Sequence, residues 1–186
     1  VTAPPPLSLS FDKAALDCFG DDNGTATVFP SGGVGDYRIL QWSHSVSTNF
    51  TIDNLTKGEY WVEIVDANNC LIRDTFEIVE PSLLQALATE SPISCFGAAN
   101  GGASVKVTNG TPPYSFEWDN GQTGVSALGL DIGTYSVTVS DAQNCKTIRT
   151  VTVTQPAEII VDFQKEGISC PDESDGTLLG IVEGGI

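Results

Sequence analysis

Methionine is absent from this 186-residue sequence, histidine occurs once, and lysine and arginine together number only eight. Aspartate and glutamate number twenty-four, so the formal net charge is -16 at pH 7. A surface of that sign repels phosphate, which argues against nucleic acid and anionic membranes as partners. No run of 18 apolar residues is present, so we expect no membrane insertion by this segment. No signal peptide begins at Val1, and we expect a mature or excerpted fragment.

The residue types that build most active sites are also scarce. His44 is the only histidine, and a single loop histidine gives no basis for a Ser–His–Asp arrangement. No Cys-x-x-Cys pair occurs, which argues against a zinc site. We therefore expect no catalytic residue and no enzyme activity. The hydrophobic content of 40% nevertheless predicts a folded chain with a packed core.

Cysteines reveal an internal repeat. Their separations along the chain are 52, 25, 50 and 25 residues, and the five are Cys18, Cys70, Cys95, Cys145 and Cys170. This long–short alternation is typical of a repeat. A proline precedes the first, third and fifth cysteines by 14 residues each time, which gives a period of 75 to 77 residues. We expect a longer parent array, of which this chain holds the tail of a preceding repeat (1–3), two repeats (4–80 and 81–155) and the start of a truncated third (156–186).

Each repeat has the pattern of short strands. Apolar side chains alternate in "TATVF" (25–29) and "ASVKV" (103–107), and Gly, Asn and Asp separate such segments. About seven strands per repeat predict an all-β fold of tandem immunoglobulin-like antiparallel β-sandwiches. The first repeat has one extra residue before Trp42 relative to the residues before Trp118. We therefore expect a β-bulge near Ile39–Leu40, because an uncompensated extra residue would invert the facing side chains.

Four aromatic residues are expected to be structural. Trp42 and Trp118 occupy the strand whose tryptophan packs the core of such sandwiches. Tyr60 and Tyr135 each follow the pattern Leu-x-x-Gly-x and fit a tyrosine corner, in which the hydroxyl bonds to backbone a few residues upstream.

Three motifs together resemble the SprB repeat. They are "CFGAANGGASV" from Cys95, "GTPPYSFEWDNG" from Gly110 and "LDIGTYSVTVSDAQNC" ending at Cys145, each with a partial counterpart in the first repeat. The first repeat departs from the pattern, with "GVGDY" in place of "GTPPY". This family occurs in long secreted surface proteins of Bacteroidetes, including a gliding-motility adhesin, and is similar in architecture to PKD and other immunoglobulin-like modules. The resemblance implies an extracellular filament secreted by the type IX system and displayed on the outer membrane.

The cysteine spacing allows two disulfide arrangements. Pairing within repeats joins Cys18 to Cys70 and Cys95 to Cys145, and leaves Cys170 for a partner beyond the window. Pairing between neighbours joins Cys70 to Cys95 and Cys145 to Cys170. We prefer the arrangement within repeats, because a domain usually keeps its own disulfide and a ~50-residue loop would gain about 3–4 kcal/mol. The usual immunoglobulin strand order opposes it, because that order places the two cysteines at opposite ends of a sandwich.

Calcium is the only cofactor with any support, and we favour no cofactor. Acidic residues cluster after two cysteines, at Asp21 and Asp22 and again at Asp172, Glu173 and Asp175. Oxygen-rich loops suit calcium. The second repeat has alanines at the corresponding positions, and no complete calcium-loop pattern occurs, so a solvated turn is the preferred interpretation.

Trp61 is the one candidate for surface binding. It has no counterpart in the second repeat and lies on the strand face opposite Tyr60, where it could stack on a sugar ring or pack against neighbouring residues. We expect a structural or adhesive segment of a secreted surface filament, whose partners are neighbouring repeats and surface polysaccharide or another cell-surface ligand. The alternative is a carbohydrate-binding or spacer module of a secreted polysaccharide-degrading enzyme.

Overall fold

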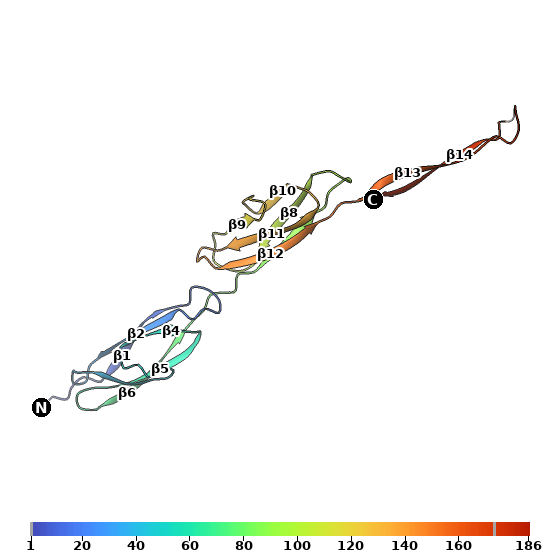
Figure 1. Ribbon diagram of the computed structural model, residues 1–186. Coiled ribbons are helices and arrows are strands. Elements are labelled where there is room, and N and C mark those ends of the chain that lie inside the picture. The colour runs from blue at the N-terminus through green and yellow to red at the C-terminus, as the bar shows by residue number, and fades with distance from the viewer. Residues whose placement is uncertain (1, 173) are drawn as a thin grey trace. The chain divides into compact units, whose positions relative to one another are not determined.

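The computed structural model describes residues 2–172 and 174–186, and its regular elements are all β-strands (Figure 1). All strand pairs are antiparallel, which confirms the predicted all-β sandwich class. The described residues form no helix long and apolar enough to cross a membrane. The chain forms two compact units.

Unit 1 holds two three-stranded sheets. One sheet has the order β1 (Ser8–Ala14), β2 (Gly24–Ser31), β4 (Thr51–Leu55). The other has the order β3 (Arg38–Trp42), β5 (Gly58–Val65), β6 (Leu71–Ile78). Six strands form this sandwich rather than the seven or so expected. The register between β3 and β5 shifts between Ile39 and Gln41, which confirms the predicted bulge.

Unit 2 repeats the same topology. Its first sheet has the order β10 (Ser126–Leu130), β8 (Gly101–Val107), β7 (Ala86–Ser91), and its second β12 (Lys146–Val153), β11 (Gly133–Ser140), β9 (Ser115–Trp118). A two-stranded hairpin of β13 (Ala157–Glu166) and β14 (Thr177–Gly185) also belongs to unit 2.

Sequence repeats and structural units do not coincide throughout. Unit 1 comprises the residues up to Leu84 together with Asn109–Thr111 and Ala142–Cys145, which lie within the second repeat of the sequence. Unit 2 comprises Gln85–Thr108, Pro112–Asp141 and Lys146–Ile186. Two short segments of the second sequence repeat are therefore part of the first folded unit.

The alternating strand faces enclose equivalent cores. Trp42 and Trp118 are each 1% exposed, and each indole N–H donates to a backbone oxygen, of Asn49 at 3.1 Å and of Gly124 at 3.1 Å. Tyr60 is buried and Tyr135 is half-buried. Their hydroxyls donate to backbone carbonyls four residues upstream, at 3.0 and 3.2 Å, so both have the geometry of a tyrosine corner.

Candidate functional site

The chemistry that the two repeats share is concentrated in two cysteine-bearing segments. We call the first the cysteine turn, which is residues 66–70 in the first repeat and 141–145 in the second. We call the other the cysteine loop, which occurs at residues 17–23, 94–100 and 169–175.

A buried aspartate organises the cysteine turn. Asp66 is 2% exposed, and its carboxylate accepts hydrogen bonds from the amides of Val34 (3.0 Å), Asn68 (2.9 Å) and Cys70 (2.8 Å). The amide of Val34 and then those of Cys70 and Asn68 hold the pKa of Asp66 below its usual value, although desolvation opposes the shift. The carboxylate therefore fixes the backbone that carries Cys70.

The second cysteine turn has the same frame. Asp141 is 7% exposed, and Asn144 has a φ of 64°, as Asn69 has a φ of 61°. Asparagine tolerates this left-handed conformation better than most residues. The turn is fastened to the loop after β8 by the amide of Ala142, which donates to the carbonyl of Thr111 at 2.9 Å.

The cysteine loop is closed by hydrogen bonds between two residues that are six positions apart in the sequence. In the first repeat, Asn23 accepts from the amide of Asp17 at 3.2 Å and donates to its carboxylate at 2.7 Å. Asn100 makes the same two bonds with Ser94, at 3.1 and 2.6 Å. In the third copy, Asp175 accepts from both the amide and the hydroxyl of Ser169. The same two positions, six residues apart, are therefore hydrogen-bonded in all three copies.

The tip of the cysteine loop is tied to the end of its own repeat. The amide of Gly20 donates to Glu80 at 3.2 Å, and Glu80 pairs with Lys57 at 2.8 Å. The amide of Gly97 donates to Gln155 at 3.1 Å. The sequence did not predict this contact, although its signal was present as the Glu or Gln that ends each repeat, directly before the proline that begins the next one.

One disulfide joins a cysteine loop to a cysteine turn. Cys18 is bonded to Cys145, with 5.6 Å between their Cα atoms and 127 residues between them along the chain. Both are half-buried, and Cys145 Sγ lies 3.4 Å from the carbonyl oxygen of Asp17. Cys70, Cys95 and Cys170 are free thiols at exposed positions.

This bond corrects the predicted pairings of Cys18 with Cys70 and Cys95 with Cys145, and it belongs to neither weighed arrangement. Strand β6 explains why. Cys70 precedes its first residue, whereas the cysteine loop begins beside its far end, where the amide of Leu16 donates to the carbonyl of Val79 at 3.1 Å. Eight strand residues separate those points by roughly 25 Å. A disulfide requires Cα atoms within about 7 Å.

Two of the acidic residues named as calcium candidates, Asp21 and Asp175, have hydrogen-bond partners within their own loops. Asp21 accepts from the amide of Cys18 at 3.0 Å, and Ser169 lowers the pKa of Asp175 through its hydroxyl and then its amide. Asp22 is exposed, and Asp172 has a φ of 71° where the other loops have Gly20 and Gly97. Glu173 lies outside the described residues. Among those described, no three His, Cys, Asp or Glu side chains group to hold a metal ion. The preference for a solvated turn over a calcium loop stays a prediction.

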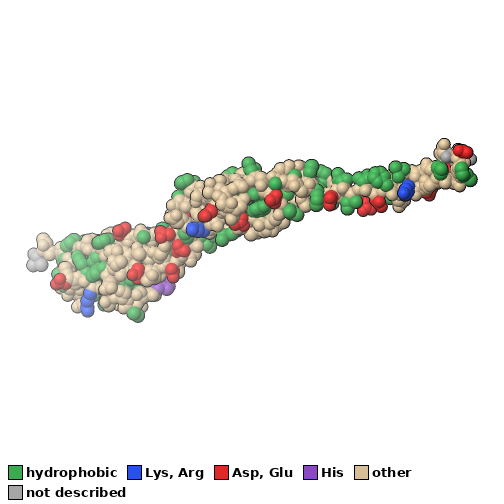
Figure 2. All heavy atoms as spheres, turned by 45° about the horizontal axis from the view of Figure 1, so that its top comes forward, with side chains coloured by type: hydrophobic (Ala, Val, Ile, Leu, Met, Phe, Trp, Pro, Cys, Tyr) green, Lys and Arg blue, Asp and Glu red, His purple; other side chains and the backbone are tan. Residues whose placement is uncertain are grey.

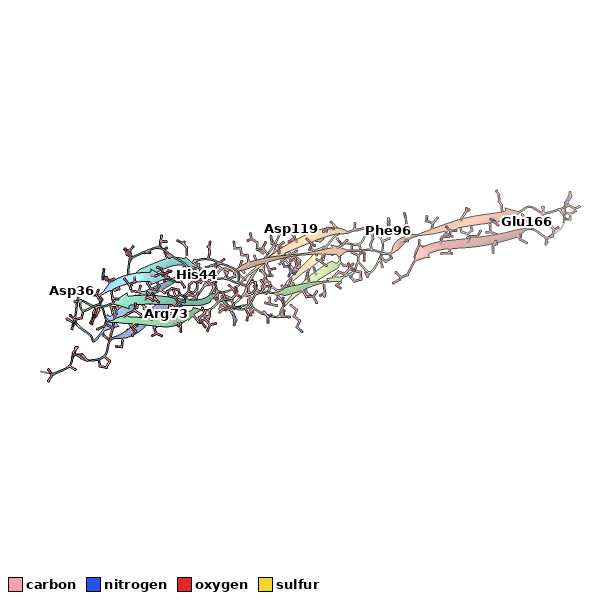
Figure 3. All side chains as sticks on the ribbon, turned by 90° about the horizontal axis from the view of Figure 1, so that it is seen from below. Asp36, His44, Arg73, Phe96, Asp119 and Glu166 are labelled. Atoms are coloured by element: carbon pink, nitrogen blue, oxygen red, sulfur yellow. A yellow bond between two sulfur atoms is a disulfide. The ribbon has the colours of Figure 1, made fainter. Side chains whose placement is uncertain are left out.

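Trp61 is half-buried rather than fully presented to solvent. The guanidinium carbon of Arg73 lies 3.7 Å from the centre of its ring, a cation–π contact between strands β5 and β6. Arg73, labelled in Figure 3, also approaches Glu63 at 3.7 Å. One face of the indole is thus occupied by a neighbouring side chain.

Several solved structures are similar to the chain at low sequence identity. The three N-terminal domains of the highly immunogenic outer capsid protein of bacteriophage RB49 match with a TM-score of 0.50 and 14% identity, over 96% of this chain and 68% of that one. An amphioxus IgVJ-C2 molecule matches with a TM-score of 0.32 and 14% identity, over 83% and 99%. A C-terminal intimin fragment in complex with the intimin-binding domain of its receptor matches with 0.37 and 15%, over 87% and 67%.

None of the curated protein sequences compared matches the chain. The SprB repeat profile matches it twice, over residues 14–45 and 87–123. The matches begin shortly before Cys18 and Cys95, and they include Trp42 in one repeat and Trp118 in the other. Over these two segments the chain matches the SprB repeat, which supports the resemblance that the sequence motifs indicated.

Proposed function

We propose that this chain is a structural and adhesive segment of a secreted bacterial surface filament. The finer features of the proposal are an adhesin similar to those of gliding motility, secretion by the type IX system, and display on the outer membrane. We place the repeats at 4–80 and 81–155, with the tail of one before them and the opening of a third at 156–186. The SprB repeat matches support this proposal.

The disulfide is the observation that carries the proposal. It closes a 127-residue separation and joins cysteines from two consecutive sequence repeats. Such bonds persist in oxidising surroundings, which supports an extracellular location. A covalent bond between repeats also suits a chain that must resist pulling, because force applied at the two ends passes through the sulfur atoms.

The perturbed acidic groups support a structural role. Backbone amides lower the pKa of Asp66, and the Lys57 ammonium lowers that of Glu80. Both carboxylates thus serve to hold turns, and neither has the raised pKa that proton transfer at neutral pH requires. The excess of acidic residues favours solubility of such a segment.

Surface display can be tested with antibodies raised against the folded 186-residue chain. They should label intact, unpermeabilised cells of the source organism, and external protease should remove the label. Monovalent Fab fragments should reduce attachment of those cells to glass under flow. Labelling that appears only after permeabilisation would contradict the proposal.

A glycan array probed with the same chain tests the alternative function. Trp61 is expected to contribute little glycan binding, because Arg73 occupies one face of its ring. Binding that disappears in Trp61→Ala and persists in Trp118→Phe would instead favour a carbohydrate-binding module.

A further inference from the structure

The disulfide joins a cysteine loop to a cysteine turn, and the chain contains a second copy of each. In these second copies the cysteine forms no disulfide. Cys95 has the same loop around it as Cys18, with Ala98 donating to the carbonyl of Cys95 at 3.1 Å as Asp21 donates to that of Cys18 at 3.2 Å. Cys70 ends a cysteine turn of the same sequence type as the one that ends at Cys145. Yet Cys70 and Cys95 are exposed free thiols, whereas their counterparts are bonded to each other.

The hairpin after the second repeat leaves the apolar face of a sandwich uncovered. Ile168 is 58% exposed, although its counterparts Leu16 and Ile93 are 2% and 3% exposed. Leu178 is 69% exposed, whereas Ala103 at the same repeat position is 4% exposed. Figure 2 shows hydrophobic side chains along the visible side of this hairpin. In the two complete sandwiches, the second three-stranded sheet accompanies the strands that correspond to this hairpin.

A cavity of about 550 Å³ opens beside Cys95 within unit 2. Its lining includes Phe96, labelled in Figure 3, and Gly184–Ile186 at the end of the hairpin. By the repeat alignment, Gly184–Ile186 correspond to Asn109–Thr111, the segment that belongs to unit 1 together with Ala142–Cys145. The backbone confirms this alignment, since a Cβ on Gly184 would meet the Glu158 carbonyl at 1.8 Å as one on Gly32 meets that of Pro6 at 1.9 Å.

The alignment of Gly184–Ile186 with Asn109–Thr111 shows which segment would contact the cavity in a complete repeat, namely a cysteine turn. In the second repeat, Ala142 of the cysteine turn donates to the carbonyl of Thr111 at 2.9 Å, and in the first repeat Ala67 donates to that of Val34 at 3.1 Å. Ile186 holds the equivalent position beside Cys95. A third cysteine turn that bonds to Ile186 in the same way would bring its own cysteine to Cys95.

We propose that the Cys95 loop, the adjoining cavity and the β13–β14 hairpin form a covalent docking site for a following repeat. Its Asp-Ala-x-Asn-Cys turn bonds to Cys95, so that the first cysteine of each repeat pairs with the second cysteine of the next. By the same rule Cys70 pairs with the loop of a preceding repeat. This inference depends on the proposed function in one respect, which is that another repeat follows this segment in the filament.

The bond forms by thiol–disulfide exchange with a small disulfide oxidant such as glutathione disulfide. The Cys95 thiolate attacks the oxidant and releases one glutathione thiolate. The thiolate of the docked turn then attacks the mixed disulfide at the Cys95 sulfur and releases the second. Two protein thiols lose two electrons and two protons, and one glutathione disulfide becomes two glutathione molecules.

The test is a chain in which residues 81–155 are duplicated in tandem after Gln155, folded with reduced and oxidised glutathione. The inserted copy carries Val125→Ile at an exposed position, so that the mass of its second-cysteine peptide differs from that of the Cys145 peptide. Peptide mapping without reduction should find Cys18 bonded to Cys145, and Cys95 bonded to the second cysteine of the inserted repeat. In the 186-residue chain, Cys95 should react fully with iodoacetamide. In the extended chain it should not react.

Two outcomes would overturn the inference. One is a Cys95 that remains reactive in the extended chain, and the other is a Cys95 bonded to Cys70 or Cys145. A Cys95→Ser variant of the extended chain should keep the bond from Cys18 to Cys145, and both inserted thiols should then be alkylated instead of only the first. Because mass spectrometry reads only connectivity, the result does not depend on whether the array is adhesive.

Discussion

The disulfide fixes how far this chain can be stretched. At about 3.5 Å per extended residue, the whole 186-residue chain spans about 650 Å. The bond from Cys18 to Cys145 removes 127 residues from that path and replaces them with a 5.6 Å step. The fully unfolded, oxidised chain should therefore extend only to about 210 Å, and reduction should release about 440 Å more.

Optical tweezers with handles at both termini can measure this difference, after the exposed thiols are alkylated. Traces with dithiothreitol should reach the full length, and traces without it should stop short. Cys145→Ser should behave as the reduced protein without any reductant. Cys70→Ser is the matched control and should leave the short extension unchanged, because Cys70 is free.

The alternative pairings give different lengths. A bond between Cys18 and Cys70 would hide only 52 residues, and Cys70→Ser would then lengthen the chain by about 180 Å. That lengthening, or an oxidised chain that reaches its full length, would refute the reasoning.

Three further predictions concern stability, each measured by urea unfolding of the 186-residue chain. Trp118→Ala should cost about 3–5 kcal/mol, because a fully buried indole is lost, whereas Trp61→Ala should cost about 1 kcal/mol; equal losses would contradict this. Gly101→Ala should destabilise by about 1–3 kcal/mol, because its Cβ would lie 2.6 Å from a Val153 methyl and 2.8 Å from the Leu130 carbonyl oxygen. Gly102→Ala, whose closest neighbour lies at 3.4 Å, should cost clearly less. Asp66 stabilises most above its unfolded pKa of about 3.9, because its folded pKa is lowered, and this contribution should be lost as the pH falls through the folded value. Asp66→Asn should therefore lower stability at pH 7 and weaken the acid dependence, and an unchanged acid limb would argue against the role of Asp66.

Local sequence patterns predicted most of the sandwich. Alternation of apolar and polar side chains along a strand shows which face is buried, and together with the equivalent tryptophans it indicated the core. The Leu-x-x-Gly-x-Tyr motif indicated the tyrosine corner. The extra residue before Trp42 predicted the bulge, because a strand has only two faces.

Disulfide pairing was harder to predict, because the spacing of five equivalent cysteines is compatible with several partners. The strand order of a sandwich was the better guide: it places Cys18 and Cys70 at opposite ends of β6. The preference for a self-contained domain conflicted with that geometry, and the geometry was correct. The contact of Arg73 with Trp61 also escaped prediction, since it depends on the side-chain conformation across two strands.

The covalent loop also has a consequence for survival among proteases. Residues 19–144 all lie between Cys18 and Cys145, and this interval contains most strands of both sandwiches. A single peptide bond cut anywhere within it leaves the two fragments joined through sulfur. Only reduction together with cleavage would separate them, so the two ends of this segment stay covalently connected after a single cut.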